Sequence, residues 1–405
     1  MGEQLLSGLK VVECGNFISA AHCAKMMADL GAEVVKIEEP GTGDESREYG
    51  PFPDDSPHPE RGGLYLYLNA NKLGITLNIK TATGQKILKE LLKDADVFVE
   101  NNPAKLMKEW ELDYARLKKI NPRLIMTSIT PFGQTGPYKD YKAYAINCCA
   151  AGGVSQITGH YWREPLTMPV SLGHYQAAIA AAGATMVALL ARDVIGHGQQ
   201  VDISEAEVWA TYHVGFGVTK YTGGAGDSLT KGYLGGGMTY PAGRLIPCKD
   251  GYIALVAPQL KQWVKFLELM GTPDWTKDPK YRDRHAMQDD YPEEVDALLT
   301  PWFLERTKKE IFEICEKNAI PFAPMYNMAD EVNDPHLKAR EFFVTVDRKE
   351  VGKLEYPGAP YKLHDAPWAL KRPAPLLGEH DEEVYCKRLG YTREDLTALK
   401  RAGII

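Results

Sequence analysis

The stretch "LKVVECGNFISAAHCAKMMADLGAEVVKIE", residues 9–38, decides the fold class. Its two ends are rich in apolar and β-branched residues, and the segment between them has apolar positions at helical spacing, which predicts a strand, a helix and a second strand. The alternation continues through "ITLNI", "TGQKILKELLKDA", "VFVEN", "LIMTSIT", the small-residue stretch 175–192 and "GQQVDIS". Because strands joined by helices run parallel and are covered on both faces, we predict an α/β protein with a doubly wound, Rossmann-like sheet.

The loops of this predicted sheet disfavour two kinds of nucleotide site. The turn after the first strand, "CGNFISAA", lacks the G-x-G-x-x-G pattern, which disfavours NAD as a cofactor. The glycine-rich "FGQTGP" at 132–137 lacks the Lys-Ser/Thr pair of a nucleoside triphosphate loop. The loop "EEPGTGDESR" at 38–47 is either a solvated turn or a segment that presents Arg47 to a phosphate.

The composition favours small metabolites as partners. The chain has 405 residues, 44% hydrophobic and 25% charged, with a net charge of −7, so nothing attracts it to nucleic acid or to an anionic membrane. Seven cysteines without C-x-x-C spacing indicate reduced thiols and no metal site. No signal-peptide pattern opens the sequence and no run of eighteen apolar residues occurs, so we expect a cytoplasmic protein.

Motifs that are weak one by one form a specific series along nearly the whole chain. They are "GAEVVKIEEPGTGD", "NANKLGITLNI", "ADVFVEN", "LDYARLKKINPRLI", "FGQTGPY", "GQQVDISEAE", "ADEVNDPHLKAREFF" and "PAPLLGEHDEEV". In this order the chain resembles the class III CoA-transferases, a family that includes formyl-CoA, carnitine and benzylsuccinate CoA-transferases and the α-methylacyl-CoA racemases. Coenzyme A in an acyl-CoA is therefore the expected cosubstrate.

The resemblance implies a domain organisation and an assembly. We expect a large Rossmann-like domain from residues 1–218, a glycine-rich linker and loop at 219–244, a small α/β domain at 245–325, and a C-terminal segment, 326–405, that returns to the large domain. Two such chains would be threaded through each other as interlocked rings. Coenzyme A would lie on the large domain, and the residues implied to contact it are Asn71, Lys72, Asn101, Asn102, Lys105 and Tyr144.

In these transferases an aspartate in a G-D dipeptide before a small-residue helix attacks the thioester, and Gly173-His174 occupies that place here. No Asp or Glu occurs between Glu164 and Asp193, and a shift of one residue would turn a helical side chain by about 100°. Two interpretations stay open. In the first, the chain does not catalyse the transfer, and His174 is a polar group bonded to backbone or water. In the second, the chain is an active acyl-CoA transferase or another acyl-CoA enzyme that uses His174.

Further departures from the family pattern bear on these interpretations. The run "ENNPAKLMKEWELDY" places Glu109 where the family has a basic residue that holds the coenzyme. Two like charges 4 Å apart in water repel each other by about 1 kcal/mol, so Glu109 beside a phosphate of the coenzyme would weaken binding. Lys105 or Lys108 would have to compensate for this repulsion. In "KAYAIN", Tyr144 stands where the racemases have a histidine, so we disfavour racemase activity.

The expected protein is therefore a subunit without the catalytic aspartate in a heteromeric class III transferase. Its partner would be an aspartate-bearing paralogue in a heterodimer or heterotetramer. The heteromeric type it resembles is succinyl-CoA:(R)-benzylsuccinate CoA-transferase of anaerobic toluene degradation. Glycine-rich loops of the family cover the active site, and Gly235, Gly236 and Gly237 either form such a loop or belong to a linker.

Overall fold

The computed structural model describes residues 4–159, 164–212 and 239–405. The chain divides into two compact units. The first unit combines residues 1–156, 166–228 and 341–405, so it contains both ends of the sequence. The second unit combines residues 157–165 and 229–340.

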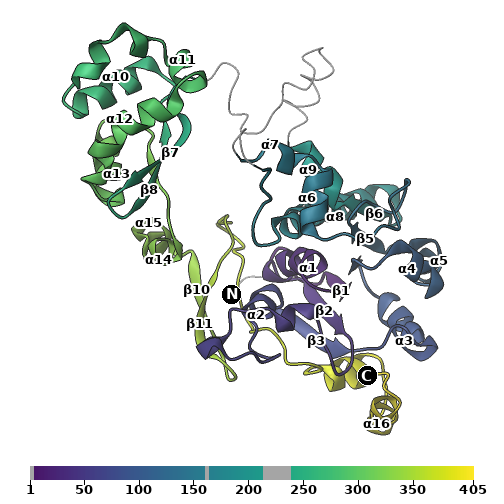
Figure 1. Ribbon diagram of the computed structural model, residues 1–405. Helices are drawn as coiled ribbons and strands as arrows, with labels where there is room; N and C mark the ends of the chain where they lie inside the picture. Colours follow the sequence, from purple (N-terminus) through teal and green to yellow (C-terminus); the bar gives the residue numbers. More distant parts are fainter. Residues whose placement is uncertain (1–3, 160–163, 213–238) are drawn as a thin grey trace. The chain divides into compact units, whose positions relative to one another are not determined.

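The first unit is built on a parallel sheet of six strands in the order β3-β2-β1-β4-β5-β6 (Figure 1). The strands are β1 (Lys10–Cys14), β2 (Glu33–Glu38), β3 (Lys72–Thr76), β4 (Val97–Glu100), β5 (Ile125–Thr130) and β6 (Gln200–Ser204). This order reverses between β1 and β4, as in doubly wound dinucleotide folds. The predicted parallel α/β architecture is confirmed.

Helices cover both faces of this sheet. Successive strand residues point to opposite faces, so Val11 packs with α1 (Ser19–Asp29) and α8 (Leu172–Ile195), whereas Val12 packs with α3 (Ala82–Leu92) and α5 (Tyr114–Ile120). The other helices of this unit include α2 (Gly63–Leu68), α4 (Ala104–Glu109), α6 (Ala145–Ala151), α9 (Glu205–Thr211) and α16 (Arg393–Arg401). The short helix α7 (Val154–Ile157) ends at the border of the two units.

The helix α8 packs closely because its buried face consists of small residues. Ala177, Ala178 and Ala181 are fully buried and belong to one cluster with Ala20 and Ala24 of α1. Within the described part of the chain, α8 is also the one helix long and apolar enough to span a membrane by length and composition. Core helices pass the same test, and the contacts of α8 with α1, β5 and β6 place one of its faces in this core.

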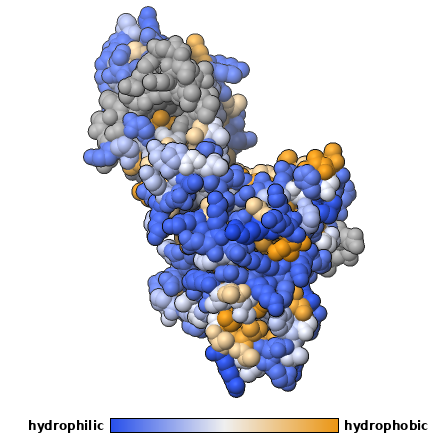
Figure 2. All heavy atoms as spheres, turned by 90° about the vertical axis from the view of Figure 1, so that its right-hand side faces the viewer, coloured by the Kyte–Doolittle hydropathy of each residue, from blue (hydrophilic) through white to orange (hydrophobic). Residues whose placement is uncertain are grey.

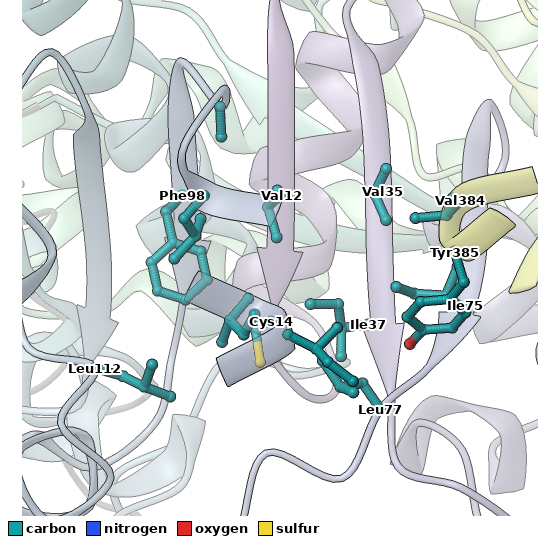
Figure 3. Close-up of a cluster of buried hydrophobic side chains, with 14 of the residues drawn as sticks. Val12, Cys14, Val35, Ile37, Ile75, Leu77, Phe98, Leu112, Val384 and Tyr385 are labelled. Atoms are coloured by element: carbon teal, nitrogen blue, oxygen red, sulfur yellow. The ribbon is translucent and has the colours of Figure 1, made fainter. Parts of the chain in front are cut away.

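The C-terminal segment completes the sheet edge beside β3. After the hairpin of β10 (Phe343–Arg348) and β11 (Gly352–Pro357), Asp381 accepts a hydrogen bond from the backbone N–H of Thr76 at 3.0 Å. Figure 3 shows Val384 and Tyr385 of this segment beside Ile75 of β3. The strand β3 ends at Thr76, within the predicted "ITLNI" run. Leu77 N–H still donates to Glu38 O of β2 at 2.8 Å, but Asn78 N–H donates to Ile404 O at 2.7 Å.

The second unit has its own core under a three-stranded antiparallel sheet of order β7-β8-β9. Its strands are β7 (Ala242–Cys248), β8 (Gly251–Val256) and β9 (Ala323–Pro324), and its helices are α10 (Leu260–Leu269), α11 (Arg284–Asp289), α12 (Pro292–Leu304), α13 (Lys308–Lys317), α14 (Met328–Asn333) and α15 (Pro335–Ala339). Trp263, Phe266 and Phe303 fill the core.

Two borders differ from the sequence expectation. The unit ends at Arg340 rather than near 325, because α14 and α15 cluster with it, and β7 already occupies the end of the expected linker.

Candidate active site

A cavity of about 200 Å³ opens at the carboxyl ends of the central strands, and we call it the switch-point cavity. Residues that follow β1, β2, β3 and β4 line it, among them Asn16, Asp44, Asn78, Lys80 and Asn102. It adjoins the point where the strand order reverses, which is where doubly wound sheets bind ligands. Among its lining residues Lys80 is the one cation, and it already pairs with Glu39 at 2.7 Å.

The turn before α1 forms one wall of this cavity and depends on Gly15 and Asn101. A Cβ on Gly15 would lie 2.2 Å from Cβ of Ala20 and 2.9 Å from the Asn101 side chain, so only glycine fits. Asn101 accepts from Asn16 N–H at 2.9 Å and donates to Asn16 O at 2.7 Å and to Ser19 Oγ at 3.0 Å. Asn101 therefore shapes the turn, and these bonds engage both ends of the side-chain amide that was expected to contact the coenzyme.

Lys72 and Asn71 are also held within the protein. Lys72 is buried, and its ammonium donates to Glu13, to Ala21 O and to Asn69 at 2.7, 2.8 and 2.9 Å, which uses all three protons. The expectation that Lys72 contacts the coenzyme needs correction, because the side chain is fully buried and its ammonium is bonded within the protein. Asn71 has φ 66°, and its side-chain amide donates to Ala369 O at 2.8 Å. This hydrogen bond holds the C-terminal segment against the start of β3.

The remaining predicted contacts are more accessible. Asn102 lines the switch-point cavity and donates to Cys14 O at 2.8 Å. Lys105 is exposed on the first turn of α4, and Glu109 is exposed at its end. Tyr144 is 72% exposed and precedes α6. Gly235, Gly236 and Gly237 lie outside the described residues.

A buried ion network fixes the loop between the central strands. Lys36 of β2 bonds to Glu13 at 2.9 Å and to Asp44 at 2.7 Å. Burial alone would lower the pKa of Lys36, but Asp44 and Glu13 hold it above its usual value. Burial lowers the pKa of Lys72 to about 8, against the attraction of Glu13. The network holds Asp44, and with it the start of the loop 44–48.

Arg47 in this loop is not free for a phosphate. Its guanidinium is buried and donates to both oxygens of Glu38, at 2.7 and 2.9 Å, and to Glu60 at 2.8 Å. It also lies over the ring of Tyr65, 3.7 Å from the centroid. Of the two interpretations of this loop, presentation of Arg47 to a ligand is excluded by these contacts, and the residue secures the loop instead.

His174 lies in a second cavity, of about 280 Å³, which we call the His174 cavity. It occupies the first turn of α8 and is 13% exposed. The cavity is lined by Phe17, Glu45, Tyr49, Tyr144, Ala145, Ile146, Met168, Ser171 and His174. Three of these residues are aromatic besides His174, and Glu45 supplies a carboxylate from the loop 44–48. The structure therefore brings His174 and Tyr144 together, and adds Glu45.

The side-chain partner of His174 is Glu205, the first residue of α9. Nδ1 lies 2.9 Å from each carboxylate oxygen, and the carboxylate is 3% exposed. One of the two interpretations of His174 expected a bond to backbone or water, and it was wrong about the partner of Nδ1. The reason is that α8 and α9 pack together, which brings residues 31 apart in the chain into contact.

One hydrogen-bonded wall separates the two cavities. Glu45 N–H donates to Asn16 Oδ1 at 2.8 Å, and Asn16 Nδ2 donates back to Glu45 Oε2 at 3.3 Å. Phe17 N–H donates to Asp44 Oδ1 at 3.2 Å. Asn16 and Asp44 face the switch-point cavity, while Phe17 and Glu45 face the His174 cavity. A ligand longer than either cavity could therefore reach both only by passing over this wall.

Sequence reasoning missed Glu205 and Glu45. Glu205 follows the last strand in "DISEAE", and Ser204 caps its helix by accepting from Glu207 N–H at 3.3 Å, which suggests a solvated first-turn acid. Only the burial of Glu205 beside His174 distinguishes it from such a solvated acid. Glu45 lies in the loop 38–47, in which the sequence indicated Arg47 as the candidate ligand-binding residue. Among the described residues no group of three or more His, Cys, Asp or Glu side chains could hold a metal ion.

Comparisons with known proteins agree with the motif series. The model of CoA-transferase family III matches residues 6–381. The chain is 30% identical to the succinyl-CoA–L-malate CoA-transferase beta subunit of Chloroflexus aurantiacus, over 99% of this chain and 98% of that one. It is 31% identical to subunit BbsE of the succinyl-CoA:(R)-benzylsuccinate CoA-transferase of Thauera aromatica, over 95% and 94%. The crystal structure of a CaiB/BaiF family protein from Brucella suis superposes with a TM-score of 0.84 at 26% identity, covering 95% of this chain and 100% of that chain.

Proposed function

Because this chain belongs to CoA-transferase family III, we propose that it is the subunit of a heteromeric CoA-transferase that does not carry the covalent nucleophile. The complex moves CoA from an acyl-CoA such as succinyl-CoA to a carboxylic acid such as (R)-benzylsuccinate, in the cytoplasm. The observation that carries this proposal is His174 at the start of α8, in a stretch without Asp or Glu from 165 to 192.

The chemistry of the exchange explains why this replacement matters. A carboxylate attacks the thioester, releases CoA thiolate and becomes a mixed anhydride; the thiolate then attacks the enzyme carbonyl, and the donor acid departs. The acceptor acid attacks the resulting enzyme thioester, and CoA finally moves to the acceptor. An imidazole can accept an acyl group, but it has no carbonyl carbon that could hold CoA as a thioester. His174 therefore cannot complete the cycle.

The switch-point cavity is the proposed place for the coenzyme on this chain. Asn102 lines it, and the exposed Lys105 of the following helix is available to a phosphate. The exposed carboxylate of Glu109, at the end of that helix, opposes an anion. We therefore propose weaker CoA binding here than in a subunit with a cation at that position.

The proposed partner is an aspartate-bearing paralogue, threaded with this chain as interlocked rings. Two relatives are themselves named as subunits of succinyl-CoA-dependent transferases. The outer face of α8 also favours a partner, because Ile179, Val187, Leu190 and Val194 are between 50% and 87% exposed on one helical stripe. Figure 2 shows apolar groups gathered in separate patches on a mostly polar surface.

The test is reconstitution of the exchange reaction. The chain alone, and the chain co-expressed with an aspartate-bearing paralogue from the same genome, are incubated with succinyl-CoA and (R)-benzylsuccinate. Formation of benzylsuccinyl-CoA is followed by chromatography. We expect turnover by the complex and none by the lone chain, and replacing the partner's nucleophile should abolish it. Exchange by the lone chain at the rate of the complex would overturn the proposal.

A further inference from the structure

The hydrogen bond between His174 and Glu205 determines where the imidazole proton lies. A carboxylate only accepts hydrogen bonds when ionised, and Nδ1 lies 2.9 Å from both of its oxygens. The proton of neutral His174 is therefore on Nδ1, and Nε2 carries the lone pair. This arrangement of a carboxylate, an oriented imidazole and a free nitrogen is that of a general base.

In the described part of the chain, the thiol of Cys148 is the one other side-chain group that engages either end of this pair, at Glu205. Nε2 has no hydrogen-bond partner there, and the side chain lines the His174 cavity. Glu205 has no ion pair there other than that with His174. Of the surrounding elements, α6 places the thiol of Cys148 against Glu205, and the loop 44–49 and the residue before α6 contribute Glu45, Tyr49 and Tyr144. A positive charge on His174 would thus have Glu205 as its bonded counterion.

The cavity suits an acyl group together with a water molecule. Its volume of about 280 Å³ is several times the roughly 30 Å³ that one water occupies in the liquid. Phe17 contacts the His174 ring edge to face at 5.7 Å between centroids, and Ile146 and Met168 add apolar lining. The apolar part of this lining accommodates a carbon chain, and the exposed Tyr144 and Ile146 leave the cavity open to water.

We propose that His174 and Glu205 form a general-base pair with which this chain hydrolyses an acyl-CoA thioester. Nε2 takes a proton from water, the oxygen attacks the thioester carbonyl, and the C–S bond breaks. The imidazolium returns the proton to the leaving thiolate, so acyl-CoA and water give a carboxylic acid and CoA with no other reactant. The proposal rests on the proposed CoA site, but it does not need the partner subunit.

Within this pair the two residues have different roles. His174 is the catalytic residue, because Nε2 is the nitrogen left to take the proton of the reacting water. Glu205 is a positioning residue, since it fixes the Nδ1–H tautomer and stabilises the imidazolium through Nδ1. Removal of its carboxylate should lower the rate, because Nδ1 loses the acceptor that fixes the tautomer with the lone pair on Nε2.

The experiment measures thiol release from succinyl-CoA by the purified full chain. His174→Gln and His174→Asn should lower kcat/KM by about 10²- to 10⁴-fold, the range for loss of a general base. Glu205→Gln should lower kcat with little change in KM, while Glu205→Asp should retain part of the rate. His197→Gln is the matched control, because His197 bonds to Gly198 O beyond the other end of α8.

Binding of a thioether analogue of succinyl-CoA, measured by calorimetry, distinguishes a failure of the hydrolysis proposal from a failure of the proposed CoA site. If the analogue binds and the wild-type chain releases no thiol above the buffer rate, the hydrolysis proposal is wrong while the CoA site stands. If the analogue does not bind, both are wrong. Equal rates in wild type and in folded His174 variants, checked by circular dichroism, would also overturn the proposal.

Discussion

At the residue scale, the features that the local sequence could not predict are mostly the partners of buried polar groups. The order of apolar runs predicts where Lys36, Lys72 and Glu13 fall along strands, but their partnership depends on strand register, which pairs Glu13 with Lys36. Lys72 therefore resembles a surface lysine in sequence and is a buried structural cation in the fold. For the same reason the local sequence does not reveal the role of Glu205, because its contact with His174 forms only when α8 and α9 pack together.

Glu100 offers a prediction at this scale. It ends β4, is buried, and within the described residues its Oε1 has no hydrogen-bond partner, while Oε2 accepts from Asn102 N–H at 2.7 Å. Burial raises the pKa of Glu100 from 4.5 to about 7, against hydrogen bonds from Ser128 and Asn102. The folded state therefore holds this proton between about pH 4.5 and 7 where the unfolded state has lost it.

The sign of the resulting pH dependence follows from this difference. A raised carboxyl pKa gives a contribution to stability that is present below the unfolded pKa and lost as the pH rises through about 7. Between pH 5 and pH 8 the wild-type free energy of unfolding should fall, relative to Glu100→Gln, by about 3 kcal/mol at most. Urea denaturation at both pH values measures this, with Glu109→Gln as the exposed control. Parallel profiles for wild type and Glu100→Gln would contradict the assignment.

At the scale of elements, α8 links the core to the candidate site. One face of the helix consists of alanines that allow close approach to α1, and its first turn carries His174. The apolar stretch predicted the helix from sequence, because small residues at helical spacing are a local signal. The two cavities were not predictable, because loops from distant parts of the chain form them, and the Asn16–Glu45 wall joins segments 29 residues apart.

The packing of α8 against α1 can be tested by adding volume. Ala178 is fully buried in the cluster with Ala20 and Ala24, so Ala178→Leu should lower the free energy of unfolding by about 1–3 kcal/mol through overpacking. Ala180→Leu, at a half-buried position of the same helix, is the matched control and should change stability little. Thermal and urea unfolding of the full chain measure both. Equal stability of Ala178→Leu and wild type would show that α1 and α8 are more loosely packed than the structure indicates.

At the scale of the whole molecule, the apolar stripe along α8 would be exposed to water in a lone chain and buried in an assembled complex. Val187, Leu190 and Val194 are 66%, 72% and 87% exposed, an apolar surface that is costly to leave in water. A threaded assembly would bury far more than the roughly 1,600 Å² of a standard interface, and obligate interfaces are more apolar than transient ones. These residues therefore belong, in the proposed complex, to the contact with the partner.

A charge on this stripe should prevent assembly without unfolding the chain. Leu190→Glu, alone or with Val187→Glu, places carboxylates where the partner would pack, so the co-expressed complex should be lost, whereas Leu5→Glu, at a position 59% exposed, should leave it intact. Light scattering after size exclusion gives the mass of each species, and circular dichroism confirms folding. An unchanged complex with both glutamates would remove α8 from the interface, and a stable, monodisperse wild-type monomer would rule out the threaded rings.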